Sequence, residues 1–153
     1  MYRPDGPMPD STFKVRPASR ADLAWCVATD GHLDEVALRS KIRAGEVLVA
    51  EADGERVGLL RFDLIWSSVP FIAQIRVLET HRRRGVGRAL LQAVEEAARG
   101  YGSNAVLSSI ALGSDRTAAL GWHEAMGFER FGEVYRMFPE ERMEAFFVKL
   151  LER

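Results

Sequence analysis

Apolar residues alternate with polar ones or gather in short runs along the first half of the chain, which predicts a group of β-strands. Residues 13–17 alternate and stop at a proline, as a short edge strand does. Residues 46–52 and 56–66 are rich in Val, Leu, Ile and Phe, and Asp53-Gly54 between them is a strong turn signal. Residues 70–78 carry few charges, so we expect a central strand that is covered on both faces.

Helical spacing of apolar positions predicts three helices among these strands. Ser19 is a candidate N-cap for a helix over residues 20–29, and a second helix is expected over residues 34–43. The most regular pattern lies in residues 86–99, where apolar side chains recur every three or four positions and polar ones lie elsewhere. This segment is therefore predicted to pack one face against a sheet.

The second half of the chain continues with a strand over residues 105–110, a helix over residues 115–126 and a closing antiparallel hairpin formed by residues 128–138 and 142–151. A strand, a helix and a further strand in succession favour one parallel pair. The whole order is βααβββαβαββ. We therefore expect an α+β (α/β) fold with a mixed, largely antiparallel, twisted sheet of about seven strands, flanked by about four helices.

Length and composition agree with a single globular domain. The chain has 153 residues, of which 47% are hydrophobic and 28% are charged, so a core can form without disulfides or a structural metal. We predict that residues 12–153 form this domain. Residues 1–11 are expected to be a flexible leader, because their prolines and glycine oppose regular structure.

The charge balance and the cysteine count exclude several classes of function. Lys and Arg total 21 against 22 Asp and Glu, so no overall basic field favours nucleic acid. Cys26 is the only cysteine, which excludes an internal disulfide, and the three histidines have no metal-ligand spacing. The start of the chain has no apolar run for a signal peptide or a membrane span. We expect a cytoplasmic protein with no metal, no membrane partner and no nucleic-acid partner.

Glycines and arginines meet the predicted start of the helix over residues 86–99. The first amides of a helix have no intrahelical partner, and the helix dipole adds positive potential there, so an anion is the natural ligand. Glycines let a phosphate approach these amides and tolerate the backbone angles of a tight cradle. The segment is predicted to bind a polyanion through Arg82, Arg83, Arg84, Gly85, Val86, Gly87 and Arg88.

Three other interpretations of this segment deserve comparison. An isolated Arg-Arg-Arg run is most often a solvated face at the start of a helix. A dinucleotide-binding fingerprint would need a third glycine where Leu90 stands, and an acidic residue about twenty positions later. A P-loop would need Gly-Lys-Ser or Gly-Lys-Thr, which is absent.

Two motifs in the expected order resemble the GNAT superfamily of acetyl-CoA-dependent N-acetyltransferases. The first is Ile75-Arg76-Val77 followed by Arg82-x-x-Gly85-x-Gly87-x-Ala89-Leu90-Leu91, and the second is Ala119-x-x-Trp122-His123-x-x-x-Gly127-Phe128. The resemblance extends over residues 13–151. It implies a GNAT-like acyl-CoA N-acyltransferase fold and acetyl-CoA as co-substrate. It also implies that the Val77 backbone pairs with pantetheine in an opening between two parallel strands, while residues 82–88 surround the pyrophosphate.

His123 is the candidate catalytic residue that the resemblance implies. Members of the family commonly carry a tyrosine at this position to protonate the departing thiolate, and a histidine is able to donate a proton near neutrality. The competing interpretation is a helix histidine that packs beside Trp122 with one nitrogen bonded to the backbone. A second departure is Arg116, which stands where the family carries an asparagine.

The general base and the acceptor site have no clear motif. Gln74 cannot act as a base on its strand, and Asp63, Glu133 and Tyr135 are candidates that are more simply interpreted as surface or structural residues; a water relay is a further alternative. Acceptor choice is expected to depend on the two early helices and on apolar residues of segments 66–71 and 131–138.

The function predicted from these observations is transfer of an acetyl group from acetyl-CoA to a primary amine, most simply on a small molecule, by direct attack in a ternary complex. A protein or peptide N-acetyltransferase and a CoA-binding sensor without turnover are the alternatives. A nucleic-acid-binding module is a further alternative that only the arginine cluster favours. The family resemblance is the sole ground for expecting a homodimer.

Overall fold

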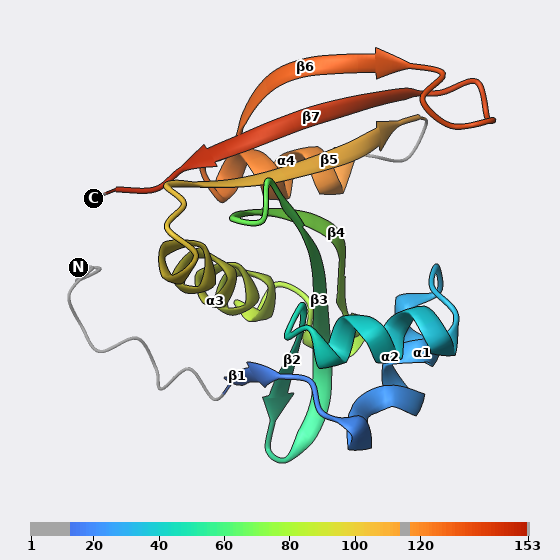
Figure 1. Cartoon of the computed structure of the whole chain (residues 1–153), viewed down its shortest axis with the longest axis vertical. Helices are drawn as coiled ribbons and strands as arrows, with labels where there is room; N and C mark the ends of the chain where they lie inside the picture. The colour runs from blue at the N-terminus through green and yellow to red at the C-terminus, as the bar shows by residue number, and fades with distance from the viewer. Residues whose placement is uncertain (1–12, 114–116, 153) are drawn as a thin grey trace. The chain divides into compact units, whose positions relative to one another are not determined.

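The computed structural model describes residues 13–113 and 117–152 and has the predicted order of strands and helices. The predicted leader over residues 1–11 lies outside the described residues. Seven strands are hydrogen-bonded in the order β1-β2-β3-β4-β5-β7-β6 (Figure 1). The strands are β1 (Phe13–Pro17), β2 (Val47–Ala52), β3 (Glu55–Ile65), β4 (Val69–Val77), β5 (Ala105–Leu112), β6 (Glu129–Tyr135) and β7 (Met143–Leu150).

Four α-helices accompany the sheet, as predicted, together with two short 3₁₀ helices. The α-helices are α1 (Leu23–Asp30), α2 (Glu35–Arg43), α3 (Val86–Gly100) and α4 (Thr117–Ala125), and the 3₁₀ helices are η1 (Arg20–Asp22) and η2 (Glu79–His81). Within the described residues, no helix is long and apolar enough to span a bilayer.

The contacts of the chain divide it into two compact units. The first unit comprises residues 13–60 and 75–91, and the second comprises residues 61–74 and 92–152. The segments β3, β4 and α3 each contribute residues to both units. The expectation of a single domain stays a prediction, and each unit is described by itself.

The first unit builds its core between α1, α2 and the early strands. Strands β1 and β2 pair antiparallel from Phe13↔Ala52 to Pro17↔Leu48, as expected for an edge strand beside its neighbour. Apolar residues from both helices and from the strands are fully buried together and form one cluster with Cys26, Leu38, Val47, Val49 and Leu59. The amphipathic pattern of α2 therefore faces this core, with Leu38 and Ile42 inward.

A buried carboxylate fixes the entry into α1. Asp22 accepts hydrogen bonds from Arg16 at 2.6 and 2.9 Å, from Arg56 Nε at 2.7 Å and from the Ser19 backbone N–H at 2.7 Å. The Arg16 guanidinium is the main reason why the pKa of Asp22 lies well below its usual range. Ser19 is confirmed as an N-cap, but the first three predicted helical residues are 3₁₀ rather than α-helical.

The second unit centres on β7, which lies between β5 and β6 (Figure 1). It pairs antiparallel with β5 from Ala105↔Leu150 to Leu112↔Met143, and with β6 from Glu129↔Val148 to Tyr135↔Met143. The closing hairpin is thus confirmed. Its first strand ends three residues earlier than predicted, because Arg136 has a φ of 61° and its N–H bonds to the Arg142 carbonyl to close the turn.

The predicted parallel pair joins β4 and β5 through Phe71↔Leu107 and Ile72↔Ser108. The central position of β4 is confirmed, but the prediction that both of its faces are covered is wrong. Only Pro70 and Ile72 are buried within this strand, and the residues that follow Ile72 are partly or fully exposed. The strand is therefore most accessible toward Val77, where the glycine- and arginine-rich segment begins.

Candidate active site

The segment between β4 and α3 is held by short-range bonds of the first unit. The Leu78 N–H bonds to the Val57 carbonyl at 2.9 Å, and η2 turns the chain before Arg82. The Arg82 side chain then reaches back, and its Nε donates to the Val77 carbonyl at 3.2 Å. These bonds connect the loop that begins at Arg82 to Val77, the last residue of β4.

Gly85 makes the turn that starts α3. Its φ is +91°, in the left-handed region that favours glycine, whereas Gly87 has no positive φ and belongs to α3. The first bond of the helix joins the Ala89 N–H to the Gly85 carbonyl at 3.0 Å. The amides of Val86, Gly87 and Arg88 precede it and form the helix end that attracts an anion.

The arginines of the loop differ from Arg16, Arg39 and Arg56 of the first unit, each of which has an acidic partner. Arg82, Arg83, Arg84 and Arg88 are exposed, and the described residues include no ion pair to any of them. Arg16, by contrast, bonds to both Asp22 and Glu51. These arginines have no acidic partner among the described residues, so their positive charge favours a polyanionic ligand. A charge run that only faces solvent would commonly include acidic residues.

The amino-terminal turn of α3 packs directly on β3 at Gly58, a residue that lies outside the predicted motifs. A Cβ built on Gly58 would lie 2.8 Å from Val86 Cγ1 and 3.2 Å from Leu90 Cδ1. Because Gly58 has no side chain, the first turn of α3 can pack closely against β3. The signal was available, because a single glycine inside a strand pattern indicates a close approach of another segment.

His123 lies in α4 and is buried in the second unit, with 5% of its surface exposed. Three aromatic rings surround it, with centroid distances of 5.0 Å to Trp122, 5.1 Å to Phe128 and 4.9 Å to Phe147. Its Nδ1 lies 2.7 Å from the Ala119 carbonyl, and its Nε2 lies 2.8 Å from Ser108 Oγ. Both ring nitrogens thus have partners inside the unit.

The hydrogen-bond partners define the tautomer of the neutral His123 ring. A carbonyl only accepts, so Nδ1 carries the proton, and in the neutral ring Nε2 accepts the Ser108 hydroxyl proton. Burial lowers the pKa of His123, and the bond to Ala119 opposes this effect. Ser108, which the sequence analysis did not identify, is therefore the hydrogen-bond partner of Nε2.

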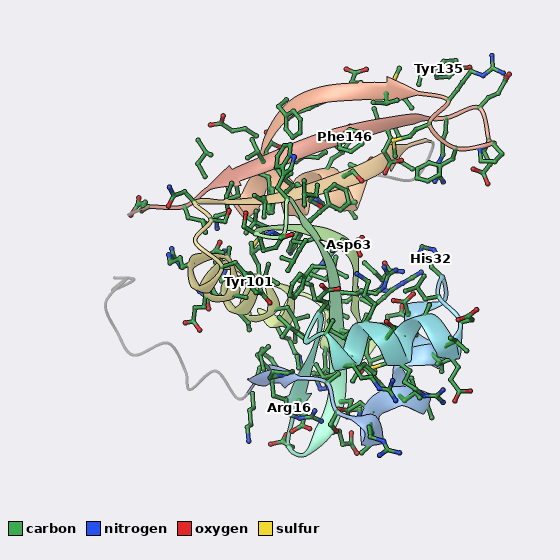
Figure 2. All side chains as sticks on the ribbon, in the orientation of Figure 1. Arg16, His32, Asp63, Tyr101, Tyr135 and Phe146 are labelled. Atoms are coloured by element: carbon green, nitrogen blue, oxygen red, sulfur yellow. The ribbon has the colours of Figure 1, made fainter. Side chains whose placement is uncertain are left out.

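The other candidate residues are spread over several strands. Glu133 is exposed and forms an ion pair with Arg130 at 2.7 Å, and Tyr135 is exposed at the end of β6 (Figure 2). Asp63 is half-buried on β3 (Figure 2). Arg116 lies outside the described residues. Within the described ranges, no group of three or more His, Cys, Asp or Glu side chains could hold a metal ion.

Comparison with known proteins decides the family. The model of the Acetyltransferase (GNAT) family matches residues 16–128, which is more than half of the chain. The chain belongs to the GNAT family. It is also 32% identical over 146 residues to the aminoglycoside N(6')-acetyltransferase type 1 of Klebsiella aerogenes, a match that covers 82% of this chain and 95% of the relative.

Solved GNAT structures share the fold of this family member. Ard1 from Thermoplasma volcanium has a TM-score of 0.80 at 17% identity, covering 93% of this chain and 99% of its own. YncA from Salmonella typhimurium, solved with its cofactor acetyl-CoA, has a TM-score of 0.75 at 20% identity, covering 92% of this chain and 95% of its own. The family match and the aminoglycoside-acetyltransferase relative show that the protein is an acetyl-CoA-dependent acyltransferase, and these structures share its fold.

Proposed function

We propose that this GNAT enzyme transfers the acetyl group of acetyl-CoA to a primary amine of a small molecule by direct attack in a ternary complex. The helix end at Gly85 carries the proposal. It combines an exposed turn, three leading amides and four arginines that have no ion pair within the described part of the chain. The relative that acetylates an aminoglycoside supports a small amine acceptor.

The cofactor fits the residues of the loop in a specific way. The pyrophosphate binds the leading amides of α3 and the side chains of the exposed arginines, while pantetheine pairs with the backbone of Val77. The Val77 carbonyl already accepts a bond from Arg82 Nε. A pantetheine amide that takes this carbonyl releases the Arg82 guanidinium for the pyrophosphate, so cofactor binding exchanges one hydrogen bond for two.

The chemistry requires a neutral amine and a protonated leaving group. An amine with a pKa of about 10.4 costs about 4–5 kcal/mol to deprotonate at pH 7. Its nitrogen then attacks the thioester carbonyl, the C–N bond forms and the C–S bond breaks. The sulfur leaves with the bonding electrons and takes up one proton, and the acylated nitrogen loses one.

The environment of Cys26 supports direct attack over a covalent acyl-enzyme. Cys26 is the only cysteine of the chain and is completely buried in the core of the first unit. Burial raises the pKa of this thiol to about 11, so little thiolate exists near neutral pH. The acetyl group therefore passes to the acceptor without a cysteine intermediate.

His123 has a proposed role as a proton relay that acts through Ser108. Nδ1 is bonded to the Ala119 carbonyl, so the proposed relay uses the Ser108 hydroxyl, which is bonded to Nε2. Replacing His123 by Phe preserves the aromatic packing and removes both polar bonds, so we expect turnover to fall by about tenfold or more while acetyl-CoA binding persists. Unchanged turnover with an identified acceptor would eliminate this role.

The proposed function is tested by release of free thiol from acetyl-CoA across a panel of amines, amino acids, aminoglycosides and short peptides. A control without acceptor measures hydrolysis. Acceptor-dependent release with a small amine supports the proposal, and release with peptides alone contradicts the small-molecule acceptor. Tight acetyl-CoA binding without release in any sample would point to a CoA sensor instead.

A further inference from the structure

The two faces of β7 have different surroundings within the second unit. Phe147 contacts the His123 ring in α4, and Lys149 forms an ion pair with Glu95 of α3, so the helical segments of this unit cover that face. Side chains alternate along a strand, so Glu144 and Phe146 belong to the opposite face. Among the described elements of this unit, no helix forms a hydrogen bond, ion pair or ring contact with either residue.

Glu144 is a buried carboxylate, and within the described ranges one of its oxygens has no hydrogen-bond partner. Its side chain is 9% exposed, and Oε1 accepts the hydroxyl proton of Ser109 at 2.9 Å. Oε2 has no hydrogen-bond partner among the described residues, and neither has the buried Nε of Arg142, although the two atoms lie 3.9 Å apart. A buried polar atom without a partner costs about 1–3 kcal/mol. A ligand group that bonds to Glu144 Oε2 would therefore be favoured.

Aromatic side chains lie along the same face. The Phe146 ring is 6.2 Å from Phe71 on β4 and 6.2 Å from Phe131 on β6, and Phe131 is 59% exposed. Phe146 lies midway along β7 (Figure 2) and pairs in register with Ser109, the residue that bonds to Glu144. Aromatic faces beside a carboxylate are suited to a cationic amine with apolar ring carbons.

Building on the proposed function, we infer that Glu144 and the row Phe71, Phe146 and Phe131 bind the acceptor, and that this acceptor is an amino sugar. An ammonium or hydroxyl group of the ligand donates to Oε2, and the sugar carbons lie on the aromatic row. Arg142 occupies the neighbouring position in the free protein, where its guanidinium lies 4.6 Å above the Phe138 ring, and it moves aside when the ligand enters.

This inference predicts different effects of two substitutions on ligand binding. Glu144→Gln keeps the shape and the bond to Ser109 but removes the charge, so it weakens binding of a polycationic amino sugar by about tenfold or more. Arg142→Ala removes a competing cation and leaves binding equal or tighter. If the pair were only structural, both variants would lower thermal stability and change ligand binding in the same direction. Glu129→Gln is a matched control, because it removes an exposed carboxylate from the adjacent strand β6.

The experiment is calorimetric titration of the full chain with kanamycin A, with acetyl-CoA titrations and melting curves for each variant. Binding that Glu144→Gln weakens and Arg142→Ala preserves supports the inference. No binding to the unaltered protein, equal binding by Glu144→Gln, or equal loss in both variants overturns it. The thiol-release panel is independent of this readout, so failure of acetyl transfer contradicts the proposed function without deciding the acceptor site.

Discussion

Gly58 sets how closely the start of α3 approaches β3, and its replacement tests whether this approach supports cofactor binding. A methyl group at this position would meet Val86 Cγ1 at 2.8 Å, which is shorter by at least about 0.7 Å than the separation at which carbon atoms attract best. It would also lie 3.4 Å from the Arg76 carbonyl oxygen. Val86 and Leu90 are fully buried, so neither side chain can turn toward solvent.

The expected loss of stability in Gly58→Ala follows from this steric overlap. Overpacking costs about 1–3 kcal/mol, so Gly58→Ala should lower the free energy of unfolding by about 2 kcal/mol. Val86→Ala removes two buried methyl groups and should cost about 1.6 kcal/mol. In the double variant the new methyl group uses the space that Val86 vacates. The double variant should therefore lose at least about 1 kcal/mol less than the sum of the single variants.

Urea unfolding and calorimetric titration with acetyl-CoA measure both effects in the same set of proteins. Gly58→Ala shifts the amides that follow Gly85, so its acetyl-CoA affinity should fall and the double variant should recover part of it. Gly100→Ala is the matched control, because its added carbon meets no atom within 4 Å. Additive energies, or an unaltered acetyl-CoA affinity in Gly58→Ala, would refute the reasoning.

Two further substitutions probe charge and backbone strain in the first unit. Asp22→Asn should lower the free energy of unfolding by about 2 kcal/mol at pH 7, because Asp22 is buried against Arg16 and Arg56. The folded pKa of Asp22 is depressed, so the difference between the proteins should persist above about pH 4 and shrink as the pH falls further; urea unfolding at pH 7 and pH 3 checks this sign. Arg83 has a φ of +61°, so Arg83→Gly should keep or raise the melting temperature while it weakens acetyl-CoA binding about fivefold. A lower melting temperature with unaltered affinity would contradict the second expectation.

Local sequence patterns were sufficient to predict those helices and turns whose formation depends on residues close in the chain. The apolar spacing that predicted α3 describes its buried face, with Val86, Leu90 and Val94 inward. The turn at Asp53-Gly54 was also predicted, and both residues have positive φ in the structure. Such features depend on backbone preference and on periodicity, so a single sequence is enough to reveal them.

The position of β7 between β5 and β6 was not predicted, although the parallel pair of β4 and β5 was. Nothing in a local window shows that β7 enters between β5 and β6, since chain order alone favours a simple meander. The same limit applies to the partners of His123. The family resemblance pointed to the position of His123, but its bond with Ser108 forms only because β5 lies beside α4 in the folded unit. The burial of Asp22 likewise requires an arginine from β1 and one from β3.

The cofactor loop was easier to predict from the sequence than the inferred acceptor surface, because the loop residues are consecutive and the surface residues come from different strands. Acetyl-CoA is proposed to bind amides and arginines that are consecutive in the chain, so the pattern is compact and common to a family. The acceptor surface draws Phe71 from β4, Ser109 from β5, Phe131 from β6 and Glu144 from β7. Each of these residues is ordinary in its own strand, and only pairing across the sheet brings them together. One substitution on any of the four strands can therefore change the acceptor while the cofactor loop stays intact. Segments 66–71 and 131–138 were expected to shape the acceptor site, and they supply Phe71 and Phe131 to the inferred surface. Ser109 and Glu144 were not predicted, because their contact forms only by pairing of β5 with β7.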